Sequence, residues 1–146
     1  MTKIFIVGLL FVLTESAAAQ TNEVVLIGID GCRPDAMAAA NTPNLDALMA
    51  NGTFSLDALN TGITISGPGW ASLLTGVWPE KHGVTDNSFA GEDFASYPHL
   101  FQRIEEYDSA LNTVSIVQWH PINNEMAEGV ADVVINVDDH TDFVEE

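Results

Sequence analysis

The sequence predicts an α/β fold, a three-layer sandwich with a mostly parallel central sheet between layers of helices. Residues 23–29 form a nearly unbroken apolar run rich in β-branched side chains, and short runs of this kind are typical of strands buried on both faces. Further strands are expected at 53–59, 113–118 and 133–137, and helical segments stand between the first three. With 146 residues, of which 47% are hydrophobic, the chain can bury a core and is not expected to be disordered.

Residues 1–19 are typical of a secretory signal peptide. Lys3 precedes an apolar run at 4–13, and small alanines stand where a signal peptidase cleaves. The run is short for a bilayer-spanning helix, and the alternative is an uncleaved N-terminal anchor. We therefore expect cleavage after Ala19. The mature protein, residues 20–146, is then expected in the periplasm or secreted, with no membrane attachment.

Charge and cysteine content restrict the partners. The net charge is −17, from 4 basic and 21 acidic residues, which disfavours a nucleic-acid-binding surface because phosphate contacts need Lys and Arg. A phosphate ester substrate would instead need a bound metal ion to attract it. Cys32 is the single cysteine, so no intramolecular disulfide forms, which for an exported protein fits a bacterial periplasm or exterior.

Asp30 and Gly31 directly follow the first predicted strand. Ligands of open α/β sheets bind at the carboxyl ends of the strands, so Asp30 lies where chemistry is expected. The alternative is an aspartate that only caps the following turn. Pro34 and Asp35 then favour a short helical turn through the alanines at 38–40.

Residues 41–52 predict one compact helix. Pro43 suits its first helical position and Gly52 the stop that follows it. Apolar side chains share one face of this helix, which we expect to pack on the sheet: Leu45, Leu48 and Met49.

Ser66 lies between a β-branched run at 61–65 and a helical segment at 70–75 that ends at Gly76. The glycines and proline around Ser66 require a sharp turn, which would present its hydroxyl with the N–H groups of a helix start directed at an anion. Such a loop is more often only a loop, so a nucleophile assignment depends on partners elsewhere. Residues 78–87 predict a further loop, and residues 100–107 a helix.

Taken together, these segments resemble the alkaline phosphatase superfamily, with type I phosphodiesterases and nucleotide pyrophosphatases as the nearest branch. Short motifs carry the resemblance in order and with family-like spacing: Ile27-Gly28-Ile29-Asp30-Gly31, Thr42-Pro43-Asn44-Leu45, Ser66-Gly67-Pro68, Leu74-Thr75-Gly76, Pro79-Glu80 and His82-Gly83-Val84. Each motif alone is weak, and the ordered set is specific. The resemblance implies that residues 20–146 are the N-terminal part of an alkaline phosphatase-like hydrolase domain.

The resemblance also implies roles for individual residues. Asp30 falls on a metal ligand, and Ser66 on the covalent nucleophile, which also binds metal. Asn87 falls on a residue that contacts a phosphoryl oxygen, its alternative being a turn residue after Asp86. His82 falls on a structural position, a histidine that bonds the backbone.

The implied cofactors are two divalent metal ions, with zinc as the expected metal, which clamp the attacking and leaving oxygens. The resemblance places further Asp and His ligands downstream, and we expect them beyond Glu146. Ser66 would form a phosphoseryl intermediate, which water then hydrolyses.

The sequence thus predicts a metal-dependent phosphodiesterase-like hydrolase of a small-molecule phosphate ester. Gly69 and Trp70 stand where the nearest branch often has Asn-His, and Trp70 stands where sulfatases carry arginine. Two alternatives stay open: a phosphonate or sulfate ester hydrolase with an unmodified serine, and a truncated, non-catalytic metal- or ligand-binding domain. The oligomeric state is left open.

Overall fold

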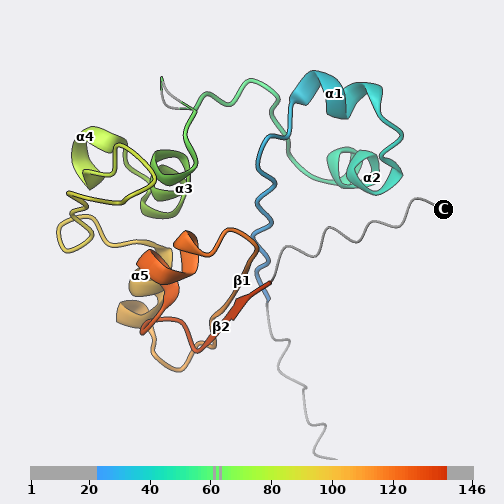
Figure 1. Ribbon diagram of the computed structural model, residues 1–146. Coiled ribbons are helices and arrows are strands. Elements are labelled where there is room, and N and C mark those ends of the chain that lie inside the picture. Colours follow the sequence, from blue (N-terminus) through green and yellow to red (C-terminus); the bar gives the residue numbers. More distant parts are fainter. Residues whose placement is uncertain (1–22, 61, 63, 138–146) are drawn as a thin grey trace, which may run out of the picture. The chain divides into compact units, whose positions relative to one another are not determined.

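The computed structural model describes residues 23–60, 62 and 64–137 (Figure 1). The chain divides into two compact units, Met1–Gly31 and Cys32–Glu146. All the helices and strands of the described residues lie in the second unit: α1 (Pro34–Ala39), α2 (Pro43–Asn51), α3 (Ser66–Thr75), α4 (Pro79–His82), α5 (Leu100–Tyr107), β1 (Val114–Val117), the π-helix η1 (Asn123–Ala127) and β2 (Val133–Asn136).

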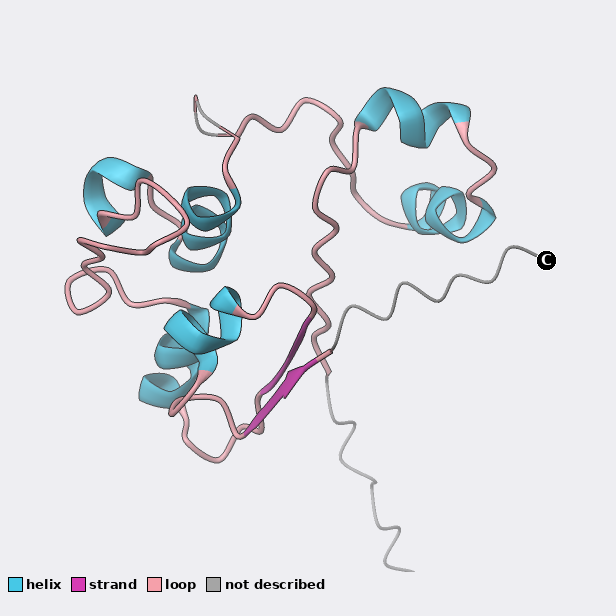
Figure 2. Cartoon of the chain, viewed as in Figure 1, coloured by secondary structure: helices cyan, strands magenta, loops and turns pink. Residues whose placement is uncertain are grey.

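β1 and β2 pair in parallel, and the chain between them passes through η1 (Figure 2). Val114 stands opposite Val133, and the register continues to Val117 opposite Asn136. This confirms the two strands expected at the end of the sequence. A helical connection between parallel strands is a βαβ-type crossover, consistent with an α/β fragment.

One face of this sheet is held by a buried amide in η1. Asn123 is fully buried; its Oδ1 accepts a hydrogen bond from Ser115 Oγ at 2.5 Å, and its Nδ2 donates to the carbonyl of Ile135 at 3.0 Å. Both strands therefore bond to the same side chain. Burying a side-chain amide without hydrogen-bond partners costs free energy. These bonds therefore favour one position of η1 against the sheet.

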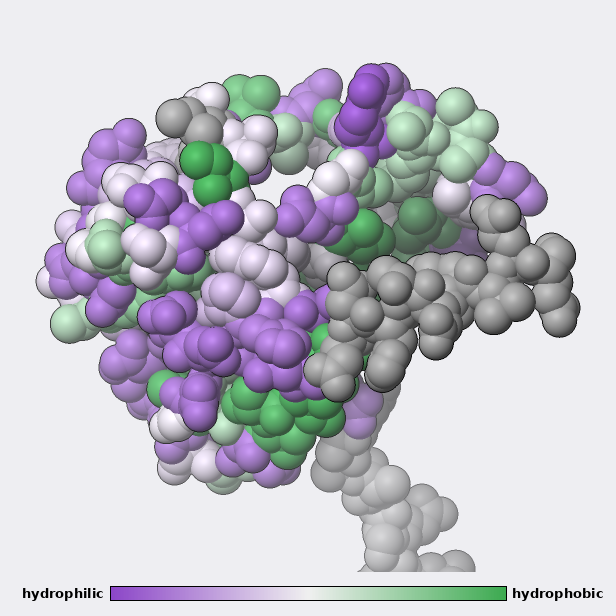
Figure 3. Space-filling model, viewed as in Figure 1, coloured by the Kyte–Doolittle hydropathy of each residue, from purple (hydrophilic) through white to green (hydrophobic). Residues whose placement is uncertain are grey.

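The other face of the sheet is apolar and exposed. In the observed register Val114 opposes Val133 and Ile116 opposes Ile135, and these four side chains are 43–60% exposed. Figure 3 shows hydrophobic surface over this part of the chain. The small sheet thus has one packed face and one bare face, and the three-layer sandwich stays a prediction.

The core lies around α3 and η1. Its buried apolar side chains come from α3, from the segment between α4 and α5, and from η1 with the residue before it: Ala71, Leu74, Val84, Phe89, Phe94, Ile122 and Met126. His99 is buried beside Phe94 and accepts a hydrogen bond from the Gln102 amide at the start of α5.

Proline and glycine signals correctly located α1, α2 and the end of α3. α2 starts at Pro43, and α3 ends at Gly76, whose φ of +72° is the left-handed conformation that glycine adopts readily. α3 begins earlier than expected, at Ser66, with Pro68 in its first turn, where a missing N–H costs no helical bond. The predicted loop 78–87 contains the short helix α4, and η1 was not predicted at all.

Two of the four predicted strands are wrong for the described structure. Residues 23–29 are extended but unpaired, and Val24 is 94% exposed. An apolar run becomes a buried strand only when neighbouring strands and covering helices are present, and none pairs with it among the described residues. Residues 53–59 bend instead, with Ser55 Oγ accepting a bond from the Asp57 amide.

The apolar face of α2 is not packed as predicted. Leu48 is 67% exposed, whereas Leu45 and Met49 are half-buried. No helix among the described residues is long and apolar enough to span a bilayer. The predicted signal peptide, residues 1–19, lies outside the described residues.

Candidate active site

Ser66 is the first residue of α3. Ile65 before it is extended, with φ −107° and ψ 142°, so the backbone passes from extended to helical at the serine itself. Ser66 is half-buried. The predicted turn into a helix at Ser66 is therefore present.

Asn87 is joined to the residue that follows Ser66. The backbone N–H of Gly67 donates to Asn87 Oδ1 at 2.8 Å. Because a backbone N–H can only donate, this bond assigns the oxygen of the amide, and the NH₂ group of Asn87 is its remaining donor. The structure thus brings together two of the three predicted site residues, Ser66 and Asn87.

Gly67 permits this contact because it has no side chain. A Cβ at this position would lie 2.5 Å from the carbonyl oxygen of Asp86 and 3.1 Å from Cα of Asn87. Only glycine allows the backbone at 86–87 to approach α3 so closely. The glycine next to the serine, which the sequence indicated only as a turn residue, is a packing requirement.

The turn that carries Asn87 is held by its neighbours. Asp86 Oδ1 accepts hydrogen bonds from Ser88 Oγ at 2.5 Å and from the Ser88 amide at 2.8 Å, and these bonds hold the pKa of Asp86 below its usual value. Phe89 then adopts a left-handed backbone, φ 57°, with its ring buried against Trp119. Asp86 supplies the side chain that bonds within this turn, and Asn87, which lies in the turn, bonds out of it to Gly67.

The start of α3 does not offer the array of N–H groups that the sequence predicted. The Gly67 N–H is bonded to Asn87, Pro68 has none, and the Gly69 N–H donates to the Ile65 carbonyl at 3.1 Å. A short proline-containing first turn uses up these donors. The NH₂ group of Asn87 is a donor beside this turn that could meet an anion.

Asp30 belongs to the first unit, where it lies in an exposed turn before Gly31, whose φ is +68°. Ser66 and Asn87 belong to the second unit, so a place for Asp30 beside them stays a prediction. Among the described residues no group of three or more His, Cys, Asp or Glu side chains could hold a metal ion. Structural and catalytic zinc sites use three or four protein ligands, so the described residues do not make up a complete site.

A family profile described as type I phosphodiesterase / nucleotide pyrophosphatase matches residues 24–136, more than half of the chain. The chain belongs to this family. The match continues past Asn87, where the predicted resemblance stopped, and includes β1, η1 and β2.

Curated relatives agree with this membership. Bis(5'-adenosyl)-triphosphatase enpp4 of Xenopus laevis is 29% identical over 103 residues, which are 67% of this chain and 23% of that protein. Ectonucleotide pyrophosphatase/phosphodiesterase family member 7 of Homo sapiens is 32% identical over 68 residues, 47% of this chain and 15% of that protein. The chain spans less than a quarter of the length of either relative. No solved structure matches it.

The phosphodiesterase-family motif at 82–84 has the structural role that the sequence predicted. His82 is fully buried, and its Nδ1 accepts a hydrogen bond from the Val84 amide at 3.1 Å. Its Nε2 lies 2.9 Å from Ser72 Oγ on α3. Burial lowers the pKa of His82, so the ring is neutral near pH 7.

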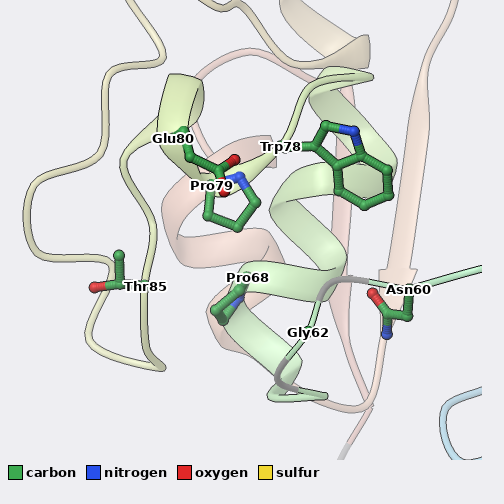
Figure 4. A pocket seen from close by; sticks show the side chains of 7 residues that line it. All are labelled: Asn60, Gly62, Pro68, Trp78, Pro79, Glu80 and Thr85. Carbon is green, nitrogen blue, oxygen red and sulfur yellow. The ribbon is translucent and has the colours of Figure 1, made fainter.

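A hollow of about 510 Å³ adjoins the first turn of α3 (Figure 4). Its lining includes Pro68, two residues after Ser66, and Thr85, two residues before Asn87. In Figure 4, Pro68 lies between Thr85 on one side and Asn60 on the other, below Trp78. Trp78 is 53% exposed and lines this hollow.

Proposed function

We propose that this chain carries the nucleophile of a metal-dependent phosphodiesterase-like hydrolase, with Ser66 as the attacking residue. The observation that supports this most is the Gly67–Asn87 hydrogen bond, which holds an amide donor next to the serine. Family membership supplies the reaction class, hydrolysis of a phosphoric ester.

In the proposed reaction Ser66 Oγ attacks phosphorus and the bond from phosphorus to the leaving oxygen breaks. The serine gives up its proton, and the leaving oxygen takes one. A water molecule then hydrolyses the phosphoseryl bond and restores the hydroxyl. The NH₂ group of Asn87 donates to a non-bridging oxygen, whose charge changes as the reaction proceeds.

Two divalent ions, with zinc as the expected metal, are part of the proposal, with Asp30 and Ser66 among their ligands. A chain with net charge −17 repels a phosphate ester, so positive charge has to be supplied from outside its side chains. When bound, such ions make a coordinated hydroxyl more acidic and stabilise a leaving oxygen. Among the described residues no group of three or more His, Cys, Asp or Glu side chains makes up such a site, so further ligands are part of the proposal.

The proposed substrate is a small molecule with a phosphodiester or pyrophosphate bond. The names of the two relatives, a bis-adenosyl triphosphatase and a pyrophosphatase/phosphodiesterase, support that class. We further propose that the protein works in the periplasm or outside the cell after loss of residues 1–19.

Hydrolysis of bis-p-nitrophenyl phosphate with added zinc tests the proposal, in the complete protein encoded by the reading frame that contains this chain. Ser66→Ala is expected to lower kcat by at least about 1,000-fold, because the covalent step is lost. Ser96→Ala, at an exposed serine in another turn, is the matched control and should leave turnover unchanged. Equal turnover in Ser66→Ala and the parent protein would remove the nucleophile assignment.

A comparison of ester substrates separates this proposal from the two alternative functions. p-Nitrophenyl sulfate and a phosphonate ester are offered beside the diester, and the diester is expected to have the highest kcat/KM. A higher value for the sulfate or phosphonate would favour the other hydrolase class. Zinc binding without turnover of any ester would favour a non-catalytic binding domain.

A further inference from the structure

The segment that carries Asn87 is tied to α3 at two places. At its end, Asn87 Oδ1 accepts the N–H of Gly67 at 2.8 Å. At its beginning, His82 Nε2 lies 2.9 Å from Ser72 Oγ. Residues 82–87, which we call the Asn87 segment, therefore run antiparallel to α3, since the later segment residue meets the earlier helix residue.

The hydrogen bonds of His82 determine where its proton is. The Val84 backbone N–H donates to Nδ1, so Nδ1 carries no proton. The neutral ring then carries its proton on Nε2 and donates it to Ser72 Oγ. Both ring nitrogens are engaged, one within the segment and one with the helix.

Packing between the two contacts restricts the path of the segment. Val84 is 0% exposed and lies in the core cluster with Ala71 of α3, which is also 0% exposed. Gly83 has φ +78° and leaves no room for a Cβ beside the carbonyl oxygen of Gly91. These contacts restrict residues 82–84, whereas Thr85, Asp86 and Asn87 are exposed, so the end of the segment is held by the Asn87 bond to Gly67.

We propose that His82, held by Ser72, is a positioning residue that places Asn87 on the amide of Gly67 beside Ser66. His82 fixes the start of the Asn87 segment, and the buried side chain of Val84 fixes the next residues. Together they place Asn87, at the end of the segment, next to Gly67. The chemical consequence rests on the role of Asn87 in the proposed function. The positioning itself concerns only the Gly67–Asn87 bond and is measurable without turnover.

Hydrogen exchange of the Gly67 amide, in the ¹⁵N-labelled 146-residue chain, reports on that bond. Ser72→Ala removes the acceptor of His82 with little change in shape. We expect the Gly67 amide to exchange about tenfold faster in this variant. The amide of Gly76, bonded to the Ser72 carbonyl, and the amide of Asp108, bonded to the Ile104 carbonyl, are expected to change less than about twofold.

Two histidine variants sharpen the test. His82→Gln keeps a donor near the position of Nε2 and is expected to restore part of the Gly67 protection that His82→Ala loses. His99→Gln is the matched control, since His99 is also buried but caps α5, and it should leave Gly67 protection unchanged. Unchanged Gly67 exchange in Ser72→Ala would overturn the proposal. Equal acceleration at Gly67, Gly76 and Asp108 would also overturn it, because His82 would then only stabilise the whole fold.

Activity of the complete protein separates this inference from the proposed function. Ser72→Ala and Asn87→Ala are each expected to lower kcat/KM about tenfold or more, and the double variant no further than Asn87→Ala alone. If Asn87→Ala has full activity, the proposed role of Asn87 fails. The exchange of the Gly67 amide still decides whether His82 positions it.

Discussion

Residues 23–59 and residues 66–94 both carry family motifs, but they differ in packing. In the second region Ala71, Val84 and His82 are fully buried. In the first region Val24 is 94% and Leu59 is 87% exposed, and α1 and α2 contain no buried residue. A motif records a local backbone preference, whereas burial requires other parts of the fold to lie against it. Ser66 and Asn87 of the candidate site lie in residues 66–94, the region that contains buried apolar side chains.

The contrast predicts a large difference in hydrogen exchange. Amides of residues 71–75, inside α3, are expected to exchange at least about 1,000-fold more slowly than amides of residues 24–29, which have no strand partner among the described residues. Exchange followed by mass spectrometry at peptide resolution measures both. Strong protection of residues 24–29 would show that this segment pairs as the buried strand that the sequence predicted.

Truncation of a buried and of an exposed apolar side chain should change the free energy of unfolding by different amounts. Met126 is 1% exposed, and Met126→Ala is expected to lower the free energy of unfolding by about 3 kcal/mol through the cavity it leaves. Leu59→Ala, at the 87% exposed position, is expected to change it by less than about 0.5 kcal/mol. Urea denaturation followed by circular dichroism compares them, and similar losses would mean that the first region is packed.

The close approach at Gly67 predicts a smaller, local effect. Gly67→Ala is expected to destabilise the protein by about 2 kcal/mol, because its Cβ would lie 2.5 Å from the Asp86 carbonyl oxygen. It should also displace the Asn87 side-chain NH₂ resonances. Gly62→Ala, where a Cβ meets nothing within 4 Å, is the control. Unshifted Asn87 resonances in Gly67→Ala would contradict the close contact.

The two buried histidines predict a modest pH dependence. Burial lowers the pKa of His82 and of His99, against the opposing effect of Glu80 and Glu92 respectively. Below about pH 6.5 these histidines therefore bind protons more readily in the unfolded chain than in the folded chain. Their contribution to the free energy of unfolding is fully present above about pH 6.5 and is lost as the pH falls below that value. The Tm is expected to fall by about 3 °C between pH 7.5 and pH 5.5.

Single variants locate this pH effect. His99→Gln and His82→Gln should each make the dependence of Tm on pH shallower between these values. Asp86 and Asp132, whose pKa values are lowered by hydrogen bonds from Ser88 and Thr113, lose their contribution only at more acidic pH. An unchanged slope in both histidine variants would assign the loss to other groups.

Much of the local structure follows from the sequence. Pro43 and Gly76 mark the start of α2 and the end of α3, because proline lacks an N–H and glycine adopts a left-handed backbone. The strands β1 and β2 were predicted from their short runs of apolar, β-branched residues. At the candidate site, a turn from extended chain into a helix around Ser66 and a His82 bonded to the backbone were both predicted. η1 was missed because a π-helix has no comparable local signal.

The sequence by itself determined that α2 begins at Pro43 and that α3 ends at Gly76, because such signals depend on near neighbours along the chain. Only the tertiary structure decided that Asn87 meets Gly67 and that His82 meets Ser72. Such contacts depend on how closely two separate backbones approach, and the absence of a Cβ at Gly67 acquires meaning only once the segment at 86–87 lies against it.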